Sequence, residues 1–157
     1  MIIQRYRPVW TDRVISLLKK HHIAADQYTE LETDFDWIVE VLKTENLMVL
    51  ATEGEELLGL LWFTTYDHWH SKDLGASDMV VSVAPAHRNG RVAKALIRAA
   101  EEWARQIGCV YFQLSAAHHT AKDLRTIRYY SHLGYKDRGS VVYKLLEKKD
   151  GSSQEGP

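Results

Sequence analysis

Apolar and polar residues alternate with two different periods along the chain, and each period predicts a different kind of element. Short apolar runs predict strands at residues 2–7, 47–52, 57–66, 79–83, 109–116 and 140–147. Apolar residues at helical spacing predict helices around residues 14–18, 35–43, 93–107 and 120–133. The polar stretch between the third and fourth strands, residues 67–77, is expected to be a loop.

The order of these elements indicates the fold class. The strongest helical pattern, residues 93–107, lies between two predicted strands and ends at Gly108, a natural helix stop. A strand, a helix and a second strand in this order predict a parallel step within a mixed α/β sheet flanked by helices. We expect one domain over residues 1–147 and a disordered polar tail over residues 148–157.

Composition excludes some classes of function but does not identify one. The 157 residues carry 20 Lys and Arg against 21 Asp and Glu, a net charge of −1 that gives no general attraction to nucleic acid or to an anionic membrane. No apolar run is long enough to span a bilayer, and the start does not read as a signal peptide. The single cysteine, Cys109, fits a reducing compartment, so we expect a cytoplasmic protein.

The histidines of the loop do not predict a metal site. His68 and His70 form a His-x-His pair, but the sequence offers no clear third ligand, so no metal is expected. Two other interpretations stay open: a loop that faces a substrate, and an ordinary exposed loop.

A basic turn stands before the strongest predicted helix. The run from Pro85 through Arg88, Gly90 and Arg91 ends a strand and opens the helix. The start of a helix presents unpaired backbone N–H groups and the positive end of the dipole, which together bind phosphate. The two arginines would add charge-assisted hydrogen bonds. The alternative is a surface turn that is merely basic.

This turn resembles the acetyl-CoA signature of the GCN5-related N-acetyltransferases (GNAT family), in which a Val-x-Pro strand end leads into Arg/Gln-x-x-Gly-x-Gly/Ala and a helix. Val83–Pro85 matches the strand end, Arg88 the first motif position and Ala93 the last. Arg91 stands at the place of the central glycine, and Gly90 comes one residue early. Either the loop is rearranged around Gly90, or Arg91 turns outward and pairs with the phosphates.

A second resemblance lies downstream, where the family often has Asn-x-x-Ala-x-x-x-Tyr-x-x-x-Gly-Phe on a late helix. The corresponding residues are Asp123, Thr126, Tyr130, Gly134 and Tyr135. The resemblance covers nearly the whole chain, from the first predicted strand to the last. The resemblance implies a splayed sheet, acetyl-CoA as cosubstrate, and transfer of an acetyl group to a primary amine of a small molecule or peptide. Homodimers are common in the family, so a homodimer is one possible state.

The resemblance also assigns residues to the cofactor. Backbone groups of Val81 and Val83 would bind the pantetheine arm, as the corresponding strand does in the family. The pyrophosphate would meet the turn formed by Arg88, Asn89, Gly90, Arg91, Val92 and Ala93.

Direct acetyl transfer needs a base for the amine, a donor to the oxyanion and an acid for the thiolate. Asp78, at the start of the strand that would bind the cofactor arm, is our first choice for the base; His118 and His119 are alternatives. The backbone N–H near Val81 would polarise the thioester carbonyl. By resemblance, Tyr130 is the acid, and its neighbour Tyr129 is the rival residue. Asp123 reads best as a helix cap.

The acceptor is expected to be a cation. Glu30, Glu32, Asp34 and Asp36 alternate with other residues, and in an extended segment all four carboxylates would point the same way. In the family this region forms one wall of the acceptor cleft, and Asp67 and Asp73 would supply the facing wall. The alternative is an acidic stretch that complements the positive end of the following helix.

The variant glycine loop also fits a different class of function. The alternative is a degenerate family member that binds CoA or a protein partner without turnover.

Overall fold

The computed structural model describes residues 1–23, 33–44, 46–68, 71–116 and 121–137, and it divides into two parts, Met1–Ala116 and Ala117–Pro157. The first part holds five strands: β1 (Ile2–Arg5), β2 (Leu47–Glu53), β3 (Glu56–Asp67), β4 (Leu74–Val83) and β5 (Cys109–Gln113). Its α-helices are α1 (Thr11–Ile23), α2 (Phe35–Leu42) and α3 (Arg91–Gln106). The second part holds α4 (Ala121–His132).

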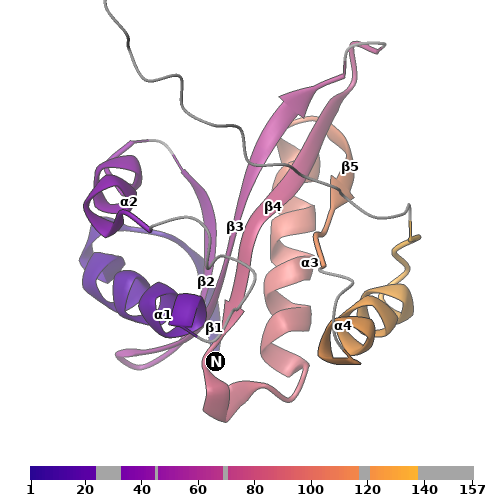
Figure 1. Ribbon diagram of the computed structural model, residues 1–157. Helices are drawn as coiled ribbons and strands as arrows, with labels where there is room; N and C mark the ends of the chain where they lie inside the picture. Colours follow the sequence, from indigo (N-terminus) through magenta and orange to yellow (C-terminus); the bar gives the residue numbers. More distant parts are fainter. Residues whose placement is uncertain (24–32, 45, 69–70, 117–120, 138–157) are drawn as a thin grey trace, which may run out of the picture. The chain divides into compact units, whose positions relative to one another are not determined.

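The five strands form one mixed sheet in the order β1-β2-β3-β4-β5. Successive strands from β1 to β4 pair antiparallel, and β4 pairs with β5 in parallel. Helix α3 makes the crossover between the two parallel strands, which confirms the parallel step that the sequence predicts (Figure 1).

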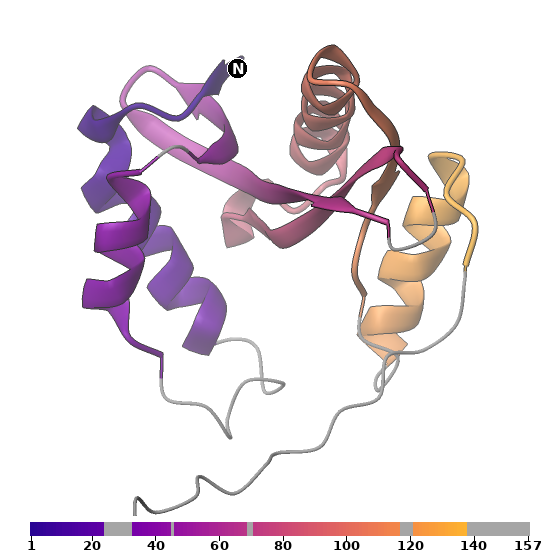
Figure 2. The same ribbon diagram turned by 90° about the horizontal axis from the view of Figure 1, so that it is seen from above.

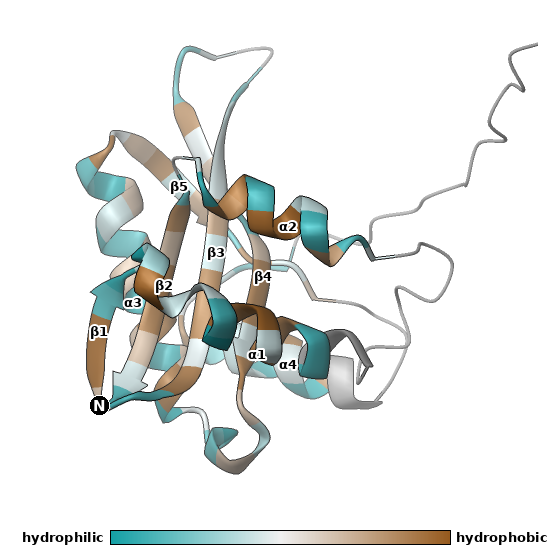
Figure 3. Cartoon of the chain, turned by 90° about the vertical axis from the view of Figure 1, so that its left-hand side faces the viewer, coloured by the Kyte–Doolittle hydropathy of each residue, from teal (hydrophilic) through white to brown (hydrophobic). Residues whose placement is uncertain are grey.

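Helices cover both faces of this sheet. Helices α1 and α2 lie on one face and α3 lies on the other (Figure 2). A hydrophobic core cluster fills the α1 and α2 side, where apolar residues of both helices meet Met48, Leu50, Leu60 and Trp62 of β2 and β3. The apolar stretches of these helices and strands are the brown segments in Figure 3. Leu50 and Leu60 are completely buried, so this cluster fixes β2 and β3 against α1 and α2.

A glycine lets α3 approach the sheet closely. A Cβ at Gly59 of β3 would stand 2.8 Å from the carbonyl oxygen of Ser82 and 3.1 and 3.2 Å from side-chain atoms of Val92 and Leu96. A larger residue there would have to displace the β4 backbone at Ser82 and press on the side chains of Val92 and Leu96. Gly59 therefore helps to set the position of the helix start that the basic turn leads into.

Four expectations for the first part need correction. The stretch 67–77 is not all loop, because β4 begins at Leu74 and β3 extends to Asp67. The first strand ends at Arg5 and the fifth at Gln113, earlier than the apolar runs suggest. Asp34 and Asp36 do not continue an extended acidic row: Asp34 caps α2, accepting the N–H of Trp37 at 2.9 Å, and Asp36 lies in its first turn.

The second part is described over α4 and the turn after it. Gly134 has φ 98° and follows the last helical turn. The N–H of Tyr135 donates to the carbonyl of Tyr130 at 3.1 Å, and the N–H of Gly134 donates to that of Ser131 at 3.0 Å, which is a Schellman motif. The end of the helix predicted over residues 120–133 is therefore confirmed. Thr120, His118, His119 and the strand expected at 140–147 lie outside the described residues, as do Glu30 and Glu32.

Candidate active site

Strands β4 and β5 separate part-way along their length. Their paired residues run only from Leu74, opposite Cys109, to Ser77, opposite Gln113. Beyond Ser77, β4 continues for six residues to Val83 and is paired on the β3 side alone. The described sheet is therefore splayed between β4 and the chain that follows β5.

A β-bulge coincides with the start of this splay. On β3, Trp62 lies opposite Val80 and Phe63 lies opposite Asp78, so Met79 is an extra residue with no partner on β3. A bulge of this kind bends its strand and increases the local twist. Met79 is 52% exposed. Sequence reasoning missed the bulge, since an apolar residue inside an apolar run gives no local signal for it.

The strand beyond the bulge directs alternate backbone groups into the splay. The N–H of Ala84 donates to the carbonyl of Leu58 at 2.9 Å. In an antiparallel ladder, the residues that bond the partner strand alternate with residues whose N–H and C=O point away from it. Counted from Ala84, the outward residues are Val83 and Val81. Both residues assigned to the pantetheine arm thus present their polar backbone on the open side.

Arg88 confirms this direction for Val83. Its Nε donates to the Val83 carbonyl oxygen at 2.9 Å. The side chain of the first motif position therefore lies along the outer edge of β4, next to the splay.

Asp78 stands where the two strands part, one residue beyond the last pair. Its Oδ1 accepts the backbone N–H of Ser115 at 2.7 Å, which links β4 to the chain after β5. Burial raises the pKa of this carboxyl above its usual value, and the hydrogen bonds from Ser115 offset part of that effect. A carboxylate whose pKa is raised by burial has the setting expected of a general base.

The basic turn begins with a 3-10 helix, η3 (Pro85–His87), and reaches α3 through Gly90. Gly90 has φ 85°, in the left-handed region that other residues adopt only with strain. Of the two alternatives that the sequence leaves open, this conformation fits the one in which the loop is rearranged around Gly90.

The N–H groups of this turn differ in what they already bind. The N–H of Arg91 donates to Oδ1 of Asn89 at 3.0 Å. The first bond within α3 runs from Lys94 to the Gly90 carbonyl, at 3.0 Å. Val92 and Ala93, in the first turn of α3, therefore have N–H groups without an acceptor inside the helix. They are the two amides of the motif best placed to receive an anion.

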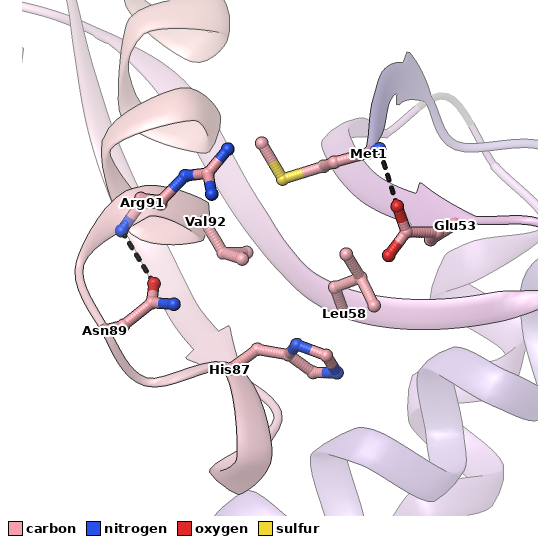
Figure 4. Close-up of a pocket in the computed structure, with 7 residues that line it drawn as sticks. All are labelled: Met1, Glu53, Leu58, His87, Asn89, Arg91 and Val92. Atoms are coloured by element: carbon pink, nitrogen blue, oxygen red, sulfur yellow. Dashed lines mark hydrogen bonds and ion pairs between the residues drawn. The ribbon is translucent and has the colours of Figure 1, made fainter.

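The Arg91 side chain turns away from the outer edge of β4. With Asn89, His87 and Val92 it lines a pocket of about 150 Å³ whose other walls are Leu58, Glu53 and Met1. Figure 4 shows its guanidinium directed into this pocket, toward Met1 and Glu53. The Met1 ammonium, 3.0 Å from the Glu53 carboxylate, lowers the pKa of Glu53, with smaller contributions from His87 and Arg91. The side chains of Arg88 and Arg91 therefore lie on different sides of the turn.

Tyr130 and Tyr129 lie on α4 in the second part of the chain. The ring centroid of Tyr130 is 6.2 Å from that of Tyr129 and 6.1 Å from that of Tyr135. Tyr130 stands four residues before the helix-ending Gly134, the spacing found in the family. Its role as the acid stays a prediction, as do the roles of Glu30 and Glu32.

The described residues give no support to two other kinds of site. No group of three or more His, Cys, Asp and Glu side chains within these ranges is arranged to hold a metal ion. Cys109 is half-buried, and burial raises its pKa, the reverse of what a nucleophilic thiol needs. No helix in the ranges described is long and apolar enough to cross a membrane.

Comparison with known proteins agrees with this geometry. The model of the acetyltransferase (GNAT) family matches residues 11–135. The chain belongs to the GNAT acetyltransferase family. A search of curated protein sequences finds no match for this chain.

Solved structures of several proteins share the fold at low sequence identity. An aminoglycoside 6'-N-acetyltransferase, AAC(6')-IG from Acinetobacter haemolyticus, is 23% identical with a TM-score of 0.72, covering 96% of this chain and 100% of its own. A transcriptional regulator from Bacillus halodurans is 19% identical with a TM-score of 0.74, covering 92% and 99%. AAC(6')-Iy, solved in complex with CoA, is 14% identical with a TM-score of 0.72, covering 94% and 100%. These likenesses confirm the mixed α/β fold of this GNAT protein.

Proposed function

We propose that this GNAT protein transfers the acetyl group of acetyl-CoA to a primary amine by direct attack. The observation that carries the proposal is the splay: β4 parts from β5 at Asp78 and presents the outward backbone of Val81 and Val83 beyond it. A cosubstrate arm with amide groups can extend such a strand by hydrogen bonding. The CoA complex of AAC(6')-Iy supports acetyl-CoA as the cosubstrate of a protein with this fold.

In the proposed reaction, the turn before α3 holds the pyrophosphate. The N–H groups of Val92 and Ala93 and the positive end of the helix dipole supply its binding site. Arg88, already beside the splay at the Val83 carbonyl, adds a charge-assisted contact when its side chain rotates toward the phosphates.

The chemical step follows from the position of Asp78. The acceptor arrives as an ammonium ion, and Asp78 takes its proton directly or through one water molecule. The nitrogen lone pair then attacks the thioester carbon, and the N–H of Val81 stabilises the negative charge on oxygen. Collapse of the tetrahedral intermediate breaks the C–S bond, and Tyr130 protonates the departing thiolate. The second proton lost by the attacking nitrogen returns to the Tyr130 phenolate, directly or through water, and the Asp78 proton leaves to solvent. The products are an amide and CoA.

Amide chemical shifts test the cosubstrate site directly. In protein labelled with ¹⁵N-valine, acetyl-CoA should shift the amide signals of Val81, Val83 and Val92 at saturation. Val9 and Val110 are internal controls, since both are exposed and lie outside the splay. Shifts confined to these controls would overturn the proposed site.

Turnover separates the enzyme from a degenerate family member. Both would show the valine shifts, but only the enzyme would release thiol from acetyl-CoA faster when an amine is added. The turn retains a left-handed glycine, Gly90, and the N–H groups of Val92 and Ala93, which have no acceptor inside the helix. These features support the enzyme over the degenerate alternative.

A further inference from the structure

A histidine connects the turn before α3 to the β2–β3 hairpin, and the reaction proposed above gives it no role. His87 is the last residue of η3, and its Nε2 lies 3.1 Å from Oε1 of Glu56, the first residue of β3. The His87 side chain is 29% exposed and lines the same pocket as Arg91. Figure 4 shows the ring directed toward the β2–β3 side of this pocket, where Leu58 and Glu53 lie. Sequence reasoning missed His87, because its partner lies 31 positions away.

Two further hydrogen bonds connect His87 to the start of α3. The His87 carbonyl accepts the N–H of Asn89 at 2.8 Å. Oδ1 of Asn89 accepts the N–H of Arg91, the first residue of α3, at 3.0 Å. The contacts that begin at Glu56 therefore end one residue before the amides that would receive the pyrophosphate. A displacement of His87 would shift those amides.

The turn has a second attachment to β3, through the backbone. The N–H of Ala84 donates to the carbonyl of Leu58 at 2.9 Å, two residues along β3 from Glu56. Between these attachments the turn borders the pocket of about 150 Å³. Close packing fixes most positions in a protein interior, and a cavity removes the contacts on one side. The contact between Glu56 and His87 therefore has a large part in fixing this side of the turn.

The strength of this contact depends on the charge of the ring. A neutral imidazole can donate one hydrogen bond to a carboxylate, whereas a protonated ring adds the attraction of opposite charges. Histidine gains its second ring proton between about pH 8 and pH 5. The charged groups that face His87 are the carboxylates of Glu56 in β3 and Glu53 in β2, and the cations of Arg91 in α3 and Met1 before β1. Because Glu56 makes the direct contact, acid pH should strengthen the link between β3 and the turn.

We propose that His87 is a positioning residue for the cosubstrate: its protonated ring, paired with Glu56, holds the turn before α3 in the conformation that binds the pyrophosphate. Acetyl-CoA then binds more tightly at about pH 6 than at about pH 8. His87 touches neither the thioester nor the amine in the proposed reaction, so the effect falls on KM for acetyl-CoA and not on kcat. This inference rests on the proposed function, whose cosubstrate site it extends.

Glu56→Gln tests the contact, because it keeps the size of the side chain and a hydrogen-bond acceptor but removes the charge. Calorimetry at about pH 6 should show CoA binding weakened by about two- to fivefold, the range of a partly exposed ion pair. At about pH 8, where a histidine is neutral, most of this difference should disappear. A phosphomonoester such as that of CoA also titrates near pH 6, so parent and variant are compared at the same pH. In turnover assays, KM for acetyl-CoA should rise and kcat should stay unchanged.

Glu55→Gln is the matched control. Glu55 lies in the same hairpin turn, and its carboxylate pairs with Arg13 at 3.1 Å. The variant removes the same charge from the same region, so it reports any general effect of charge on CoA binding. It should keep the affinity of the parent at both pH values. Equal weakening in the two variants, or an unchanged affinity in Glu56→Gln, would overturn the proposal.

A double variant tests whether His87 and Glu56 act through one contact. His87→Gln keeps a hydrogen-bond donor but cannot gain a charge, so it should weaken CoA binding at about pH 6 as Glu56→Gln does. If both residues act through the same contact, the double variant should bind CoA no more weakly than either single variant. Losses that add in the double variant would contradict the pairing.

A measurement without cosubstrate separates failure of the positioning role from failure of the proposed function. In ¹⁵N-valine-labelled protein without CoA, the Val92 amide signal should move as the pH falls from about 8 to about 5, while the signals of the exposed Val9 and Val110 stay in place. Glu56→Gln should reduce this movement, and Glu55→Gln should not. That result would support the positioning role even if the protein bound no CoA, which would contradict only the proposed function. A Val92 movement as large in Glu56→Gln as in the parent would overturn the positioning role.

Discussion

Asp78 is a carboxylate in a setting that ordinary surface carboxylates do not share. It lies largely buried at the point where β4 and β5 part, and the Ser115 N–H holds it there. Asp78→Asn keeps an oxygen that can accept this hydrogen bond but removes the basic group. We expect kcat/KM for the amine to fall by about 10²–10⁴. CoA affinity, measured by calorimetry, should stay unchanged, and a parallel loss of CoA binding would instead assign Asp78 a structural role.

The raised pKa of Asp78 also gives a dependence on pH. A base must be ionised, so kcat/KM should fall as pH drops through the pKa of Asp78, at a pH above the usual carboxylate range. For folding, a raised pKa gives stability that is full below the pKa of the unfolded chain and is lost as pH rises through the folded pKa. The free energy of unfolding of the parent, relative to Asp78→Asn, should therefore decrease from acid to neutral pH. An unchanged difference across that window would contradict the burial of the carboxyl.

Tyr66 provides a spectroscopic check on its contact with Tyr111. Burial, and the hydrogen bond from Tyr111, raise its pKa to about 12. In an ultraviolet titration of tyrosinate, one phenol should ionise near that pH, and Tyr66→Phe should remove this late step. If the late step persists in the variant, the tyrosine that titrates there is not Tyr66.

Among the secondary-structure elements, the turn before α3 carries the most specific expectations. Gly90 adopts φ 85°, and a β-branched residue there should distort the turn that presents Val92 and Ala93. Gly90→Val should weaken CoA binding strongly while the fold is retained. Gly54→Val is the matched control, because Gly54 also has a positive φ, 58°, in the β2–β3 turn and a Cβ there meets nothing within 4 Å. Similar CoA affinity in the two variants would show that the turn does not bind the cosubstrate.

The two arginines of the turn should differ in their effects. Arg88 lies at the outer edge of β4, whereas Arg91 lines the pocket with Glu53. A charge-assisted hydrogen bond contributes about 1.5–3 kcal/mol, so Arg88→Ala should cost roughly ten- to a hundredfold in CoA affinity. Arg91→Ala should cost less. A larger loss for Arg91→Ala would revive the hypothesis, drawn from the sequence, that Arg91 pairs with the phosphates.

The helices and strands differ in how well their positions could be predicted from sequence patterns. Helix α3 was predictable because its apolar residues recur at a single period and Gly108, with φ 94°, ends it. The start of β4 was missed because Gly75, Ala76 and Ser77 lack the apolar pattern of a strand. Their pairing depends on β3 and β5, which are distant in the sequence.

Some features of the candidate site could likewise be predicted from the sequence, and others could not. The Pro–basic–Gly turn is a local pattern, so Arg88 and Gly90 could be selected from the sequence. The bulge at Met79 and the bond from Ser115 to Asp78 arise from strand pairing, which local patterns do not encode. The hydrogen bond between the hydroxyls of Tyr66 and Tyr111 joins residues more than 40 positions apart, and only the sheet register brings them together.

For the whole molecule, the role of Tyr130 as the acid stays a prediction. Tyr130 lies on α4, and the other proposed groups lie within Met1–Ala116. Tyr130→Phe keeps the ring but removes the proton, so turnover should fall by about 10²–10⁴ with little change in CoA affinity. Tyr129→Phe is the matched control on the same helix. A loss in Tyr129→Phe alone would show that the wrong tyrosine was selected.

The central claim concerns the molecule as an enzyme: an acetyl group passes from acetyl-CoA to an amine. It is tested most directly with acetyl-CoA carrying a ¹³C label on the acetyl group, a panel of mono- and diamines, and detection of the labelled product by mass spectrometry. The parent protein should place the label in an amide of at least one amine, and Asp78→Asn should reduce that rate sharply. Intact acetyl-CoA across the whole panel, from a protein that binds CoA normally, would contradict the claim.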